Sequence, residues 1–111
     1  MNWIALTNEA QLREIAENSV EKPQVIFKHS SRCATSSMAK SRLERNFQPV
    51  EIDFYFLDLI AYRSLSGKVA ELFRVAHASP QVLLIKNKEC IYEESHSGIR
   101  MDEIIEQSQA A

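Results

Sequence analysis

The fold is decided by Gln24-Val-Ile-Phe-Lys-His-Ser-Ser-Arg-Cys33-Ala-Thr-Ser36, which Ser79-Pro80 complements far downstream. Val25-Ile26-Phe27 is a short apolar run, as expected for a strand covered on both faces. A polar turn follows, and apolar residues then recur at helical spacing from about Cys33 to Asn46. Cys33 is therefore expected where a helix begins, and Pro80 is expected to head a second buried strand.

The rest of the chain alternates between strand and helix patterns. The first expected elements are an edge strand at Trp3 to Leu6 and a helix capped by Thr7 or Asn8, with Gln11 three residues after Asn8. A two-sided strand is expected within Val50 to Leu59, followed by a helix that is capped by Ser64 or Ser66 and carries Leu65, Val69, Leu72 and Phe73. The last elements are a hairpin that turns at Asn87-Lys88 and a helix with Met101, Ile104 and Ile105. The order βαβαβαββα predicts an α/β fold, a central mixed sheet flanked by helices. It fits a thioredoxin-like fold.

Composition narrows the class of protein. With 111 residues, 45% of them apolar and 25% charged, the chain is expected to form one globular domain over residues 1–111. The net charge of −2 gives no electrostatic case for binding nucleic acid or an acidic membrane. No apolar run approaches the ~20 residues that span a bilayer, and no signal peptide is apparent. A cytoplasmic location, where thiols stay reduced, is expected.

Cys33 is the candidate nucleophile. A helix N-terminus favours a thiolate through its dipole and free N–H groups, and the thiolate is the reactive form. Arg32 adds positive charge, and the amides of Thr35 and Ser36, with the Ser36 hydroxyl, are expected to donate to the sulfur. Lys28 and His29 are nearby in sequence and could tune it. The alternative is a small buried cysteine at a helix start, but the polar flanks favour exposure.

Ser79-Pro80 is the expected second half of the site. If the Ser79–Pro80 bond is cis, the Ser79 backbone would be free to pair with a peptide or thiol ligand opposite Cys33. The alternative is a proline that simply starts a strand.

The other candidate residues receive structural interpretations. Cys90 lies in a predicted strand and is expected to be a buried small hydrophobe. His29, His77 and His96 lack metal-ligand spacing, so no metal is predicted and structural or solvated histidines are expected. Arg63 is interpreted as a surface cation.

The sequence resembles the monothiol bacilliredoxins, also described as YtxJ-like general stress proteins, over nearly its whole length. The resemblance rests on Phe27-Lys-His-Ser30 before Arg32-Cys33, on Ser36 in place of a second cysteine, on Val75-Ala-His77-Ala-Ser79-Pro-Gln-Val-Leu-Leu-Ile85, and on Ser95-His96 before Ile99. Where the family usually has Cys-Pro-Ile-Ser, this chain has Cys33-Ala-Thr-Ser36. The missing proline should loosen the first helical turn.

The resemblance implies a thioredoxin fold and a nucleophilic Cys33 that reduces mixed disulfides between proteins and bacillithiol. The implied partners are S-thiolated proteins and a low-molecular-weight thiol, which acts as co-substrate in place of a bound cofactor. Because Ser36 cannot release the small thiol, a second small thiol or an outside reductase must regenerate Cys33.

Two other functions remain open. One is a non-catalytic, redox-sensing or partner-binding module that uses the surface around Cys33 and Pro80. The other, suggested only by analogy with monothiol glutaredoxin-like proteins, is an iron–sulfur cluster held at a dimer interface by Cys33 and a small thiol.

Overall fold

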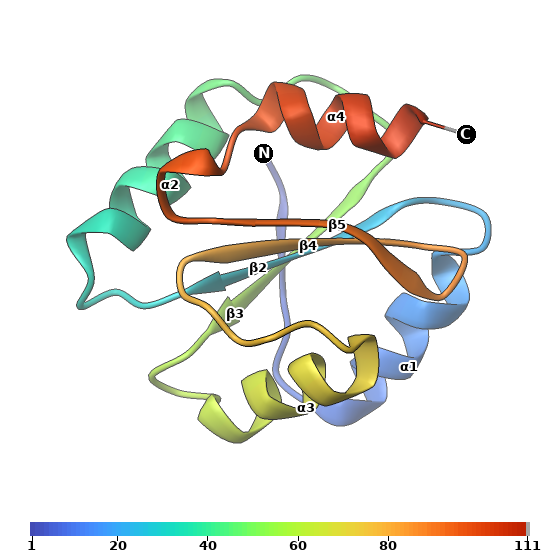
Figure 1. Cartoon of the computed structure of the whole chain (residues 1–111), viewed down its shortest axis with the longest axis horizontal. Coiled ribbons are helices and arrows are strands. Elements are labelled where there is room, and N and C mark those ends of the chain that lie inside the picture. The colour runs from blue at the N-terminus through green and yellow to red at the C-terminus, as the bar shows by residue number, and fades with distance from the viewer. Residues whose placement is uncertain (111) are drawn as a thin grey trace.

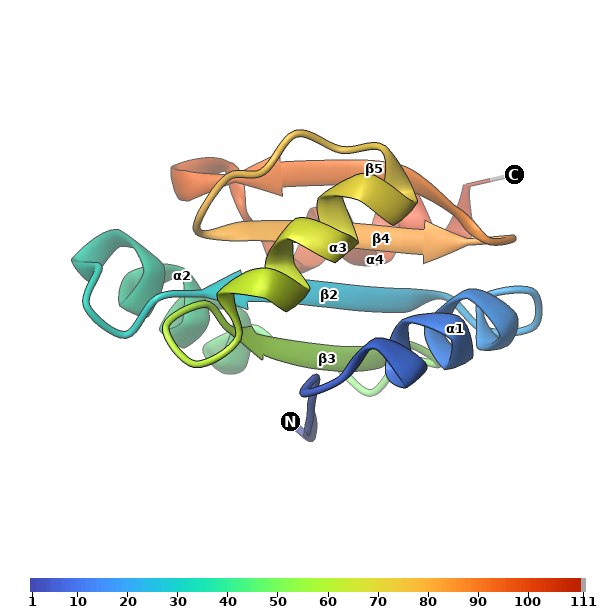
Figure 2. The ribbon, with the colours of Figure 1, turned by 90° about the horizontal axis from the view of Figure 1, so that it is seen from below.

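A five-stranded mixed sheet forms the centre of the structure, a computed structural model that describes residues 1–110. The strand order is β1-β3-β2-β4-β5, with α1 and α3 on one face and α2 and α4 on the other (Figures 1 and 2). The elements are β1 (Trp3–Ala5), α1 (Glu9–Asn18), β2 (Gln24–His29), α2 (Ala34–Arg45), β3 (Asp53–Asp58), α3 (Arg63–Phe73), β4 (Gln81–Lys86), β5 (Glu89–Ser95), a short 3₁₀ turn η1 (His96–Gly98) and α4 (Met101–Gln109). The predicted element order is confirmed.

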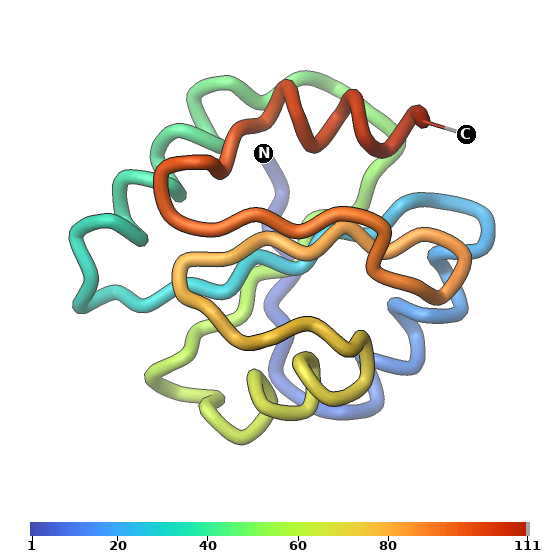
Figure 3. Tube along the Cα trace, in the orientation of Figure 1, coloured from blue at the N-terminus to red at the C-terminus, as the bar shows by residue number. Residues whose placement is uncertain are grey.

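Strand direction brings several loops to one end of the sheet. β2 and β3 run parallel, and His29 at the end of β2 pairs with Asp58 at the end of β3. β4 is antiparallel to β2, so its first residue, Gln81, pairs with Lys28. The end of β2, the end of β3 and the start of β4 therefore lie together (Figure 3). Chain segments that are distant in sequence meet there.

Each face of the sheet has its own apolar core, as the alternation within the strands predicts. Ile26 and Tyr55 pack with the residues of α1 and α3. Val25, Phe27 and Phe54 pack with the residues of α2 and α4. Lys28 follows Phe27, so its side chain lies on the α1 and α3 face, whereas that of His29 lies on the α2 face.

The predicted start of the third helix is wrong by a few residues. α3 begins at Arg63 with Tyr62 as its N-cap, rather than at a cap formed by Ser64 or Ser66. The Asp58 carboxylate causes this early start, because it accepts the N–H of Ile60 at 3.0 Å and the carbonyl of Asp58 accepts that of Tyr62 at 2.9 Å. Leu72, expected on the apolar face of this helix, is 52% exposed.

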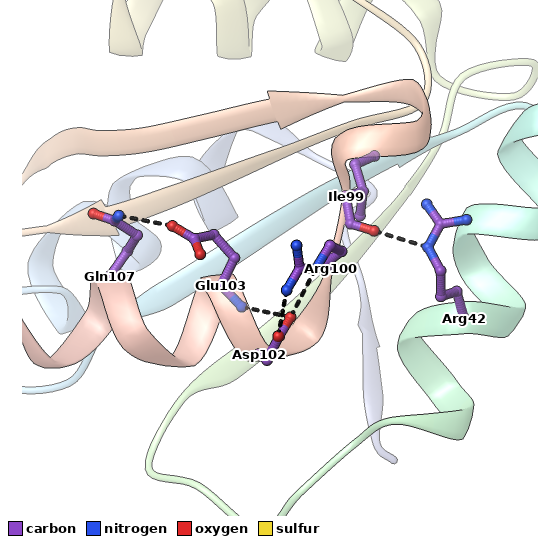
Figure 4. A network of polar contacts seen from close by, with 6 residues as sticks. All are labelled: Arg42, Ile99, Arg100, Asp102, Glu103 and Gln107. Carbon is purple, nitrogen blue, oxygen red and sulfur yellow. Dashed lines mark hydrogen bonds and ion pairs between the residues drawn. The ribbon is translucent and has the colours of Figure 1, made fainter.

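Polar contacts connect α2 to the C-terminal segment (Figure 4). Nε of Arg42 donates to the carbonyl oxygen of Ile99 at 2.9 Å, which holds α2 against the chain before α4. At the start of α4, the Asp102 carboxylate accepts hydrogen bonds from the Arg100 guanidinium and from the backbone N–H of Glu103. In residues 1–110 we find no helix with the length and apolar character needed to cross a membrane.

Candidate active site around Cys33

Cys33 lies at the N-cap of α2, where the sequence predicts it. Its backbone is extended (φ −108°, ψ 118°), and its N–H donates to the Ser30 carbonyl while its own carbonyl accepts the Ser37 amide, both at 3.1 Å. The thiol is free and half-buried. The predicted activation of this thiol by the N-terminus of α2 stays a prediction.

A cleft of about 560 Å³ opens beside the thiol. Its wall is built by four chain segments: the end of β2, the start of α2, the β3–α3 connection with the first part of α3, and the loop before β4. The lining residues are Ser30, Cys33, Leu59, Ile60, Arg63, Ser66, Gly67, His77 and Ser79. This volume falls within the range of small-molecule sites, roughly 300–1,000 Å³.

Ser79 lies on the cleft, and Pro80 directly precedes β4. The Ser79–Pro80 peptide bond is cis, and Ser79 lines the cleft with Cys33. The hydroxyl oxygen of Ser79 is buried and has no hydrogen-bond partner among the described residues. A buried hydroxyl without a partner is costly.

Ser36 contacts different groups from those expected. Its side chain is fully buried, and its oxygen accepts the Ser30 amide at 3.0 Å and lies 2.7 Å from Nδ1 of His29. The hydroxyl therefore connects the end of β2 to the first turn of α2 instead of donating to the sulfur. His29 is buried with it, and burial is the main cause that lowers the pKa of His29, followed by the charge of Lys40.

Arg32 and Thr35 are exposed beside Cys33. Among residues 1–110 no side-chain hydrogen bond caps the start of α2 from Cys33. The proposed role of Arg32 and Thr35 in stabilising the thiolate stays a prediction.

Lys28 is buried near the cleft rather than against the sulfur. Its Nζ lies 3.2 Å from Nδ1 of His77 and 3.5 Å from the Ser66 carbonyl. Burial lowers the pKa of Lys28 from 10.5 to about 8. His77, in turn, has its pKa lowered first by burial and then by the charge of Lys28.

Arg63 and His77 are the two cleft residues with an ionisable side chain that sequence reasoning did not assign to the site. Both line the cleft with Cys33, although Arg63 was interpreted as a surface cation and His77 as structural or solvated. A general signal could have found them: in parallel sheets, ligands bind outside the carboxyl ends of the strands. Arg63 follows the end of β3, and His77 precedes β4 at the same end of the sheet.

Cys90 lies in β5, as predicted, but it is only partly buried rather than fully buried, and it does not line the cleft. It packs against the α1 and α3 core, its thiol donates to the Tyr92 carbonyl at 3.3 Å, and burial raises its pKa. It pairs with Ile85, four residues along β4 from Gln81, or roughly 13 Å. Within residues 1–110, no three His, Cys, Asp or Glu side chains are grouped as metal ligands.

Solved structures with the same fold cover almost the whole chain. A protein with a thioredoxin fold, provisionally described as an oxidoreductase, is 26% identical and aligns over 96% of this chain and 93% of its own, with a TM-score of 0.79. Thioredoxin from Malassezia sympodialis (Mala s 13) is 16% identical and aligns over 96% of this chain and 91% of its own, with a TM-score of 0.74. Oxidised mitochondrial thioredoxin 3 from Saccharomyces cerevisiae is 16% identical and aligns over 96% of this chain and 93% of its own, with a TM-score of 0.73.

The family comparison is more specific than the fold. The family model of the monothiol bacilliredoxin BrxC matches residues 4–104. This range contains Cys33, Ser36 and every residue that lines the cleft. Together with the fold, the match supports a thiol redox role. The chain therefore belongs to the monothiol bacilliredoxin family.

Proposed function

We propose that this protein is a monothiol thiol-disulfide oxidoreductase that reduces mixed disulfides between proteins and a low-molecular-weight thiol of the bacillithiol type. One observation carries the proposal: Cys33 is the thiol on the cleft, while the residue one turn later is a serine that is bonded inward to His29 and Ser30.

The proposed reaction has two exchange steps. The Cys33 thiolate attacks the sulfur of the small thiol in the mixed disulfide, a new sulfur–sulfur bond forms, and the target protein leaves as a thiolate. A second small thiol, as its thiolate, then attacks the adduct. Cys33 is released and a symmetrical small-molecule disulfide forms. Two electrons pass from small thiols to the target protein, and Cys33 is unchanged over the cycle.

The cleft suits an acidic small thiol. Among the described residues that line the cleft, Arg63 is the one with a formal charge at neutral pH, and none has a carboxylate side chain. Leu59 and Ile60 supply apolar surface on the same wall. A guanidinium is suited to binding a carboxylate through two parallel hydrogen bonds. These features support a thiol that carries carboxylate groups as the co-substrate.

The test is a turnover assay with the full chain. The substrates are one target protein joined by a mixed disulfide to bacillithiol, and the same protein joined to glutathione. Each substrate is given to the wild type, to Cys33→Ser and to Cys90→Ala. We expect Cys90→Ala to retain the rate and Cys33→Ser to lose it. A wild type that releases no target protein, although a small alkylating probe still modifies Cys33, would instead favour the partner-binding module.

A further inference from the structure

A buried cation lies next to the cleft and has no carboxylate partner. The Lys28 side chain is fully buried on the α1 and α3 face of the sheet. Its recorded polar contacts are the His77 ring and the Ser66 carbonyl, and the ion pairs of residues 1–110 do not include it. A charged group buried in this way costs stability, and such groups gather at functional sites.

Lys28 determines which nitrogen of His77 carries the proton. Nδ1 of His77 lies 3.2 Å from the Lys28 ammonium and 3.2 Å from the Ser66 hydroxyl. An ammonium can only donate, so Nδ1 accepts and the ring proton is on Nε2. His77 lines the same cleft as Cys33 and is exposed. The site therefore holds a neutral imidazole with a fixed N–H donor.

We propose that His77 and Lys28 form a proton relay that protonates the sulfur leaving when Cys33 attacks a mixed disulfide. This inference rests on the proposed function. As the bond between Cys33 and the small thiol forms, the old sulfur–sulfur bond breaks and its electron pair stays on the departing sulfur. That sulfur takes the proton from Nε2 of His77, and Nδ1 takes one from the Lys28 ammonium. His77 passes through the other neutral tautomer, and the relay resets when Nδ1 returns its proton to the buried Lys28 amine and Nε2, on the exposed ring, takes a proton from water.

His77 is the catalytic residue in this relay, whereas Lys28 acts through it. His77, Cys33 and Ser79 line the same cleft, so a disulfide bound there would have the His77 ring on its wall. Burial lowers the pKa of Lys28 to about 8, close to that of a free cysteine, about 8.5. A proton can therefore pass from Lys28 to a departing cysteine thiolate with little energetic cost.

Further titratable groups lie on the elements around Lys28 and His77. They are Cys33 at the start of α2, Asp58 at the end of β3, Arg63 on α3, and Glu93 on β5, which accepts a hydrogen bond from Gln81 beside Lys28. None of them is in hydrogen-bond contact with Lys28 or His77 in residues 1–110.

The experiment compares two leaving groups on the same small thiol. In one mixed disulfide bacillithiol is joined to a peptide cysteine, which needs a proton on leaving. In the other it is joined to a nitrothiophenol, which leaves as a stable, coloured thiolate. Both present the same sulfur to Cys33. Single-turnover release is measured for His77→Phe and Lys28→Met in a Cys90→Ala background. His96→Gln and Lys68→Met are the matched controls at exposed positions outside the cleft.

We expect His77→Phe and Lys28→Met to slow peptide release by about a hundredfold and to leave nitrothiophenolate release within about twofold. With the peptide substrate, the wild-type rate should fall above about pH 8 as Lys28 loses its proton. Lys28→Met should lack the fall.

Equal slowing of both leaving groups would overturn the relay, because the two residues would then only shape the cleft. No slowing of either would also overturn it. A wild type that releases neither group would refute the proposed function, and the relay with it. Thermal unfolding checks each variant, and His77→Phe, at an exposed position, keeps the inference falsifiable if Lys28→Met does not fold.

Discussion

At the scale of single residues, the Lys28 ammonium gives the site a stability cost that depends on pH. Its pKa is about 8 in the folded protein, against an ordinary value of 10.5. Below about pH 8 both the folded and the unfolded chain hold the proton, and burial then costs on the order of 3 kcal/mol. Between these two values the unfolded chain binds more protons, so the cost disappears as pH rises.

Lys28→Met should therefore stabilise the protein most at neutral pH and below, by up to about 3 kcal/mol. The gain should shrink as pH rises from about 8 to 10.5. The measurement is urea unfolding of the variant and the wild type across this range. Lys68→Met, at an exposed position of α3, is the control and should show a small difference that does not change with pH. A Lys28→Met gain that is constant with pH would contradict the lowered pKa.

Residue chemistry could be predicted from the sequence only where it depends on neighbours along the chain. The position of Cys33 at a helix start follows from the local pattern of apolar and polar residues. The contacts of Ser36 do not, because His29 is brought to it by the packing of β2 against α2. The cis bond before Pro80 also depends on tertiary context.

At the scale of secondary-structure elements, a glycine inside α3 lowers the stability of that helix. Gly67 lies inside the helix, and a Cβ built there meets no atom within 4 Å. Glycine is less favourable than alanine in a helix by about 1 kcal/mol. Gly67→Ala should therefore raise the free energy of unfolding by up to about 1 kcal/mol. Thermal or urea unfolding measures the gain.

The other glycine provides a matched contrast. A Cβ at Gly98 would lie 2.5 Å from Cδ of Glu94. The Glu94 carboxylate would have to move and would lose its hydrogen bond from the Ser95 amide, now 2.9 Å. Gly98→Ala should thus lower stability by about 1 kcal/mol. If both variants shift stability in the same direction, the local space around these glycines does not control the outcome.

Elements with complete local signals were predicted correctly. The capping box of Asn8 and Gln11 is present, and Asn87 and Lys88 form the hairpin turn with positive φ angles of 53° and 70°. α3 was placed too late because its start depends on Asp58, which belongs to the preceding strand. A cap signal in the helix sequence itself was therefore misleading.

At the scale of the whole molecule, the site is a product of sheet topology. The β2–β3 and β2–β4 pairings place the starts of α2 and α3, with Cys33 and Arg63, and the loop with His77 at one end of the sheet. The sequence predicts the strands, but it does not indicate that Arg63 and His77 face the same cleft as Cys33. The fold was therefore easier to predict than the cleft.

The same topology separates the two cysteines. Cys90 pairs with Ile85, roughly 13 Å along β4 from the strand end beside the cleft. A disulfide needs Cα atoms within about 7 Å, so Cys33 and Cys90 cannot join in the folded monomer. After one turnover without added thiol, the wild type should keep the small thiol on Cys33. A second cysteine one helical turn away would change this outcome.

Ser36→Cys should convert the protein into one that releases the small thiol by itself. The new thiolate would attack Cys33, form a bond between residues 33 and 36, and expel the small thiol. Intact mass after a single turnover distinguishes the products: wild type and Cys90→Ala should gain the mass of the small thiol minus two hydrogens, whereas Ser36→Cys should lose two hydrogens and gain nothing. An internal disulfide in the wild type would contradict the placement of Cys90. Retention of the small thiol by Ser36→Cys would show that the buried position of residue 36 keeps it from reaching the sulfur of Cys33.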